Sequence, residues 1–277
     1  MALSVHTNEA ALVALQNLNK TSSDLADVQN RISTGLAINN ARDNASVWAI
    51  AQGQRADIGS LGAVKMSLDR ATSIADVASA AGSTISDLLV QMKEKVVAAM
   101  DPSLDTASRT ALDSDFKSVL RQISQVVQNA NFDGANMLDG SVPQIKFIAN
   151  ADATSFITLS AQNLSLGGAI ITVPATASLG TITLATAVLA QVTASISQTN
   201  QALGNLGSQS KALANDAQFV SQLTDQLTAG VGNLVDADLA KESALLQALK
   251  VQQQLGAQSL SIANQAPQVL LQLFKSS

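Results

Sequence analysis

Cysteine and tyrosine are both absent from this sequence of 277 residues, which has one tryptophan and only 3% aromatic residues. Without cysteine, the protein can form neither a disulfide scaffold nor a thiolate-metal site. The scarcity of aromatic rings argues against an ordinary globular core, which normally uses more of them. Small and aliphatic residues predominate instead, and these suit long seams between helices.

Charge is also scarce, at 13% of residues, with a net charge of −5 and a pI near 4.7. A soluble monomer usually keeps a richly charged surface, so we expect other subunits to cover much of this one. Phosphate binding needs clustered Lys and Arg, and the acidic balance therefore argues against a nucleic-acid partner.

Two kinds of hydrophobic segment are missing as well. No apolar run approaches the length that spans a membrane. Residues 1–9 lack a basic region followed by an apolar block, so no secretory signal peptide is predicted. We expect a chain that is cytoplasmic, or that leaves the cell without a cleaved signal.

The strongest positive pattern is a heptad seam over residues 192–234. Apolar, Thr and Ser residues recur there by alternating steps of four and three, which keeps one stripe of a long helix against a partner helix. A helix of this length reaches roughly 65 Å and cannot bury its seam alone. The seam positions are Val192, Ile196, Thr199, Leu203, Leu206, Ser210, Leu213, Ala217, Val220, Thr224, Leu227, Val231 and Leu234.

Further helices are predicted at residues 5–36, 45–100, 105–130 and 237–275. Gly230 and Gly232 should loosen the end of the long helix, and Asp236 should cap the last helix, with Asp238 in its first turn. Short β-branched runs predict hairpins that cap the helical rod, at residues 144–148, 156–160, 169–173 and 181–184.

The predicted fold is mainly α, a long antiparallel coiled-coil or helical-bundle rod with paired terminal helices and a small β-hairpin insert. Five segments follow from this layout. They are an N-terminal helix (1–40), the N-terminal half of the rod (41–142), a small β-rich insert (143–187), the C-terminal half of the rod (188–234) and a C-terminal helix (235–277).

Several motifs, taken in order, resemble those of bacterial flagellin. In the first half these are residues 31–39 (RISTGLAIN), 41–45 (ARDNA) and 132–134 (FDG). In the last third they are 236–242 (DADLAKE), 252–256 (QQQLG) and 263–268 (ANQAPQ). No single motif is specific, but their joint order and spacing are. The insert is short, so the large outer domains of many flagellins should be missing.

The resemblance implies a structural subunit that is exported unfolded by the flagellar export apparatus with its chaperone. It would polymerise, alone or with other flagellins, into the extracellular helical filament that acts as the propeller for swimming, between the hook-junction protein and the filament cap protein. The two terminal helices would form an inner coiled coil that lines the lumen. Residues 91–95 resemble the region that an innate immune receptor reads in some flagellins, but Gln91 and Lys95 replace the usual Arg and Leu, which predicts weak recognition.

Candidate assembly residues lie on the terminal helices and around the irregular connection near residue 40. Ion pairs between subunits could set register, although solvated charge explains the residues concerned equally well; these are Arg31, Arg42, Asp43 and Arg55. The candidate inter-subunit residues are Leu18, Leu25, Arg31, Ile32, Leu36, Arg42, Asp43, Leu245, Leu249, Leu255, Ile262, Leu270 and Leu273. Thr176, Ser178 and Thr181 in the insert are possible O-glycosylation sites, and ordinary β-region composition explains them equally well.

Other functions have weaker support. His6 is the only histidine, and no convergent carboxylate pair accompanies it, so we expect no enzyme, no cofactor and no metal site. Helix capping explains Asp236, Asp238 and Glu242 better than an oxygen-ligand site does. A non-polymerising secreted coiled-coil adaptor or adhesin, or a hook-filament junction protein, remains the alternative.

Overall fold

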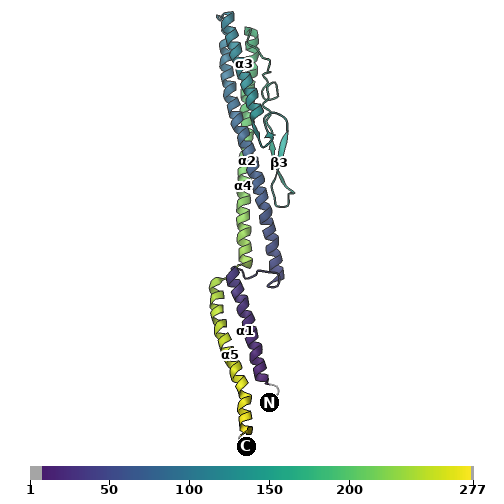
Figure 1. Ribbon diagram of the computed structural model, residues 1–277. Coiled ribbons are helices and arrows are strands. Elements are labelled where there is room, and N and C mark those ends of the chain that lie inside the picture. The colour runs from purple at the N-terminus through teal and green to yellow at the C-terminus, as the bar shows by residue number, and fades with distance from the viewer. Residues whose placement is uncertain (1–7, 276–277) are drawn as a thin grey trace. The chain divides into compact units, whose positions relative to one another are not determined.

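Five helices carry most of the computed structural model, which describes residues 8–275, with side chains described up to residue 265. The helices are α1 (Glu9–Thr34), α2 (Ala45–Ala99), α3 (Thr106–Asn129), α4 (Ile182–Val235) and α5 (Leu239–Lys275). Two short antiparallel strand pairs, β1 (Asn131–Phe132) with β2 (Ala135–Asn136) and β3 (Gln144–Ile148) with β4 (Phe156–Ser160), complete the fold (Figure 1). The mainly α prediction with a small β-hairpin insert is confirmed.

The chain divides into two compact units. We call the described residues up to Ala56 and from Gln226 onward the terminal unit, and Asp57–Asp225 the central unit. Throughout α4 the predicted heptad seam is buried or half-buried at every position except Leu234, which is 37% exposed. The seam prediction is therefore confirmed.

In the terminal unit, α1 and α5 lie side by side and run antiparallel (Figure 1). Three polar contacts fix their register from end to end. Asn8 Nδ2 donates to the carbonyl of Ala263 at 2.7 Å, and Gln253 Nε2 donates to Ser22 Oγ at 3.3 Å. Arg31 Nη1 lies 3.4 Å from Glu242 Oε1. Polar contacts at defined positions specify register where an apolar seam alone would allow sliding.

The connections that join α1 to α2 and α4 to α5 are also held together. The backbone N–H groups of Ala37 and Ile38 both donate to the carbonyl of Val235, at 2.7 and 3.2 Å. The N–H of Ala237 donates back to the carbonyl of Gly35 at 2.9 Å. Gly35 has φ +72°, the left-handed conformation that ends α1.

In the central unit, α2, α3 and α4 run alongside one another (Figure 1). Ser86 Oγ donates to Asn200 Oδ1 at 3.2 Å, and Leu203 packs directly on Gly82, so α2 and α4 are antiparallel. The core between the three helices is aliphatic with one aromatic ring. Its largest fully buried side chains include Leu68, Ile85, Leu89, Met92, Phe116 and Ile123.

The insert follows the helices and departs from the sequence prediction. The runs at 144–148 and 156–160 form the predicted hairpin, β3 with β4. The prediction of strands at 169–173 and 181–184 is wrong. Ile171 and Val173 are fully buried in an irregular loop with one isolated bridge, and residues 182–184 form the first turn of α4.

The insert also lies along the helices and does not cap them. The N–H of Ile148 donates to Ser67 Oγ on α2 at 3.2 Å, and the N–H of Ser160 donates to Gln209 Oε1 on α4 at 2.6 Å. Figure 1 shows β3 beside these helices. The predicted placement at the end of the rod is therefore wrong.

One predicted helix cap also differs. Gly230 and Gly232 both lie within α4, which continues to Val235. The cap of α5 is Asp238 and not Asp236, since Asp238 Oδ1 accepts the N–H groups of Ala240 and Lys241 at 3.0 and 3.1 Å. A side-chain oxygen at this position satisfies N–H groups that the helix itself leaves free.

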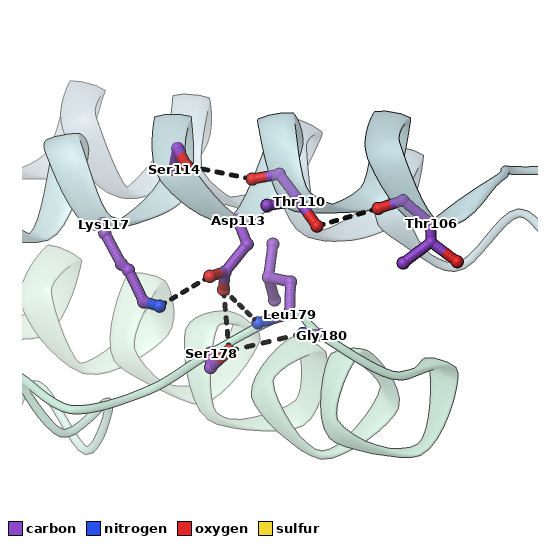
Figure 2. Close-up of polar contacts among 8 residues, drawn as sticks. All are labelled: Thr106, Thr110, Asp113, Ser114, Lys117, Ser178, Leu179 and Gly180. Carbon is purple, nitrogen blue, oxygen red and sulfur yellow. Dashed lines mark hydrogen bonds and ion pairs between the residues drawn. The ribbon is translucent and has the colours of Figure 1, made fainter.

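A buried carboxylate ties the insert to α3. Asp113, 9% exposed, accepts hydrogen bonds from Ser178 Oγ at 2.8 Å and from the N–H of Leu179 at 2.6 Å, and it pairs with Lys117 Nζ at 2.6 Å (Figure 2). Thr181 then caps α4 by accepting the N–H of Leu184 at 3.2 Å. We call Asp113, Lys117, Ser178 and Leu179 the Asp113 cluster.

Acid should weaken the Asp113 cluster. Burial alone would raise the pKa of Asp113, but the hydrogen bonds from Lys117, Leu179 and Ser178 outweigh it and hold that pKa below its usual 3.8. Because the folded-state value is the lower one, this stabilisation is full at pH values above 3.8 and is lost as the pH falls below it. Urea denaturation at pH 6 and at pH 3 should therefore show a smaller acid loss in Asp113→Asn than in the unaltered chain. An equal loss in both would contradict this.

Candidate assembly surface

The α1–α5 pair has an inner stripe that packs between the two helices. Leu18, Leu25 and Ile32 are half-buried in α1, and Val28, which the sequence reading missed, is fully buried. On α5 the inner stripe passes through Glu242, Leu246, Leu249, Gln253, Gly256, Leu260 and Ala263. Leu249 is 6% exposed. These predicted assembly residues thus contact the protein's own helices.

The outer faces of the same two helices carry exposed apolar side chains among polar ones. Of the predicted residues, Leu245, Leu255 and Ile262 are 41%, 61% and 63% exposed. The other members were not among the predicted residues. We call this set the outer stripes; its residues are Leu12, Val13, Leu15, Leu239, Leu245, Val251, Leu255 and Ile262.

Gly256 sets how closely the two helices approach. A Cβ at this position would lie 3.3 Å from Leu18 Cδ1, tighter than ordinary van der Waals contact. Replacing Gly256 with Val should therefore push α1 and α5 apart and cost about 1–3 kcal/mol of overpacking. Faster amide hydrogen exchange in α1 than in the unaltered chain would show this. Gly207→Val, at a helical glycine of α4 with open space around it, is the matched control.

The charged residues predicted near residue 40 line a polar hollow of about 380 Å³. Asp43 Oδ2 accepts the N–H groups of Asn39 and Asn40, at 2.9 and 3.1 Å, and so shapes the connection. Leu36 bridges to Asp236 through the backbone. Arg42 is exposed. The hollow is lined by Asp27, Asn30, Arg31, Thr34, Leu36, Asn39, Asn40, Arg42 and Asp43.

Arg31 joins this hollow to α5. Its ion pair with Glu242 satisfies only one carboxylate oxygen, because Glu242 Oε2 is buried without a hydrogen-bond partner. A buried carboxylate oxygen of this kind is costly to leave unpaired.

Some predicted residues lie outside what the structure describes. His6 precedes the described residues, and Leu270 and Leu273 belong to the part of α5 whose side chains are not described. Among the described residues, no group of His, Asp and Glu could hold a metal ion, and no helix is long and apolar enough to cross a membrane.

The three predicted glycosylation residues differ in surroundings. Thr176 is exposed. Ser178 Oγ donates to Asp113, and Thr181 Oγ1 accepts the N–H of Leu184. The hydroxyls of Ser178 and Thr181 are therefore engaged in hydrogen bonds within the chain.

Comparison with known proteins identifies the family. The bacterial flagellin N-terminal helical region matches residues 5–142, and the bacterial flagellin C-terminal helical region matches residues 189–274. The chain is 51% identical to Flagellin FljJ of Caulobacter vibrioides, with 99% of each chain covered. The chain belongs to the bacterial flagellin family. A flagellin of Brucella melitensis is 36% identical, with 98% of this chain and 99% of that one covered.

A solved structure supports the fold alone. The crystal structure of Bacillus cereus flagellin superimposes with a TM-score of 0.50 and 21% identity, over 60% of this chain and 94% of that one. Flagellins are structural proteins, and this one is a self-polymerising subunit of the filament, the extracellular part of the flagellum. In a filament, other copies of the same protein must contact this chain, and the outer stripes are exposed on it.

Proposed function

We propose that this flagellin polymerises through the outer stripes of α1 and α5, which neighbouring copies cover in the filament. The observation that supports this is exposure: side chains such as Val13, Leu255 and Ile262 are all more than half exposed. Large apolar side chains that stay exposed on both helices of a packed pair are candidates for burial against a partner. A filament grows by heterologous contacts, and two different helices supply two different faces for them.

The charge balance of the terminal unit favours the same role. Residues 1–56 and 226–277 contain seven Lys and Arg and seven Asp and Glu, so their net charge is zero. The remaining nine basic and fourteen acidic residues give the central unit the whole net charge of −5. Copies can therefore approach through their terminal units without long-range repulsion.

The polar hollow completes the proposed contact. Arg42 is exposed and lines this hollow. A carboxylate or amide group from a neighbouring copy would pair with Arg42 and fix register, while the outer stripes supply affinity. This division of roles is common at protein interfaces.

The finer parts of the proposal concern export and partners. We infer that the chain leaves the cell unfolded through the flagellar export apparatus, without a cleaved signal peptide, and with a chaperone to cover its terminal helices. It then meets the filament cap protein and the hook-junction protein, and it can copolymerise with other flagellins. Thr176 is the exposed candidate for O-glycosylation in the insert.

Electron microscopy of the purified protein, with and without sheared filament seeds, tests polymerisation directly. We expect hollow tubes whose growth depends on seeds. In the monomer, limited proteolysis should trim the chain near Asn40 and near Gly230, and these sites should be protected in the tubes. A discrete monomer with protected ends under the same conditions would favour the adaptor or junction protein instead.

A further inference from the structure

The central unit carries an apolar groove that is not part of the assembly surface proposed for the terminal unit. It lies between α2 and α3 and has a volume of about 460 Å³. Its floor is formed by small and aliphatic side chains and its rim by amides, with no charged residue among them. The lining residues are Val77, Ala81, Thr84, Leu88, Gln122, Gln125, Val126, Asn129 and Ala130.

A complementary feature projects from α4. The side chain of Phe219, one of six phenylalanines in the sequence, is 61% exposed. One turn away along α4 stand Asn215 and Asp216 on one side and Gln222 and Leu223 on the other, so Asp216 is the single charged neighbour. No residue of α4 lines the groove, so the aromatic ring and the groove belong to different surfaces of one central unit.

We propose that Phe219 of one copy inserts into the α2–α3 groove of a neighbouring copy. The ring and the groove differ in shape and lie on different elements, so the contact is heterologous and can propagate through a polymer. The family's self-polymerisation supplies a second copy as the occupant. This contact is separate from the proposed contact of the terminal unit.

The neutral groove limits repulsion between two copies at the proposed contact. Each central unit has a net charge of −5, so two copies repel unless their contact surfaces are neutral or paired. The groove lining has no charged residue, and Asp216 is the only charge within one turn of Phe219 along α4. A Phe side chain that becomes buried contributes about 1.5–3 kcal/mol.

The structure also gives the expected offset between the two copies. Leu203 packs on Gly82, which lies midway along the part of α2 that lines the groove. Phe219 is sixteen residues farther along α4, from position 203 to position 219. At 1.5 Å per residue, docking the ring in the groove displaces the copies by roughly 24 Å along the helices.

Cysteine crosslinking tests the contact in the full chain, which has no cysteine of its own. A double variant with Thr84→Cys and Gln222→Cys, which keeps the Phe219 ring, should give a ladder of disulfide-linked oligomers when filaments are oxidised. Thr84 is exposed at the groove and Gln222 is exposed on α4 one turn from Phe219, so neither change should disturb folding. The control pairs Thr84→Cys with Met66→Cys, because Met66 is 69% exposed on α2 outside the groove.

Assembly measurements give an independent readout. Phe219→Ser should raise the critical concentration for seeded growth about tenfold to hundredfold, whereas Met66→Ser should not. Filaments that form normally but give no ladder beyond the control would overturn the proposal. So would an unchanged critical concentration in Phe219→Ser. Normal filaments from Leu255→Asp would contradict the terminal-unit contact instead, which keeps the two failures distinguishable.

Discussion

Replacing Leu255 with Asp is expected to abolish seeded filament growth while leaving the subunit folded. Leu255 is 61% exposed on the outer stripe of α5, so the change should alter the free energy of unfolding by no more than about 0.5 kcal/mol. In the filament the same carboxylate would be covered by a neighbouring copy, at a desolvation cost of several kcal/mol. The critical concentration should therefore rise by at least about a hundredfold, equivalent to about 3 kcal/mol.

Leu249→Asp is the matched comparison, because it lies on the same helix but faces the other way. Leu249 is 6% exposed in the α1–α5 pair, so a charge there should disrupt the pair in the monomer itself. Amide hydrogen exchange should show α1 unprotected in Leu249→Asp and unchanged in Leu255→Asp. Normal filaments from Leu255→Asp would show that the outer stripe of α5 is not an assembly contact.

The second large effect concerns the Asp113 cluster. Replacing Asp113 with Ala leaves the Leu179 N–H and the Ser178 hydroxyl without their acceptor and removes the partner of Lys117. We expect a loss of about 2–4 kcal/mol in the free energy of unfolding. The partial exposure of Lys117 places its own contribution at the lower end of the range for ion pairs.

Urea denaturation of the full chain measures this loss, with Asp115→Ala as control. Asp115 also pairs with a lysine, Lys95, at 3.1 Å, but its side chain is 60% exposed. That exposed pair should contribute less than about 1 kcal/mol. Equal losses in the two variants would mean that the Asp113 cluster stabilises the insert no more than a surface ion pair does.

The sequence was most informative where one rule governed one helix. The alternating seam of α4 and the end of the helix predicted at residues 45–100, which Asp101-Pro102 follows, were predicted correctly because periodicity and proline act locally. The family motifs were recognisable for a similar reason, since their order does not depend on packing.

The prediction was wrong where packing between distant segments decided the outcome. The Thr181–Leu184 run looks like a strand, but Thr181 caps α4 and the adjacent loop is held by Asp113 in another helix.

The candidate site shows the same limit in finer detail. Leu249 and Leu255 are both apolar and helical, and both fit a heptad description of α5. The pairing of α1 with α5, including the close approach of Gly256 to Leu18, determines which of them faces α1. The sequence could therefore name the helices that form the assembly surface, but it could not separate the inner stripe from the outer stripes.

The joined connections near Gly35 and Val235 have a mechanical consequence. Their three backbone hydrogen bonds cross-brace two chain segments that would otherwise be single flexible links. Either segment can extend or rotate only if its hydrogen bonds to the other break. A force on α1 is therefore also carried by the start of α5. In a filament subunit under torque, the two linked connections should therefore resist bending more than either connection alone.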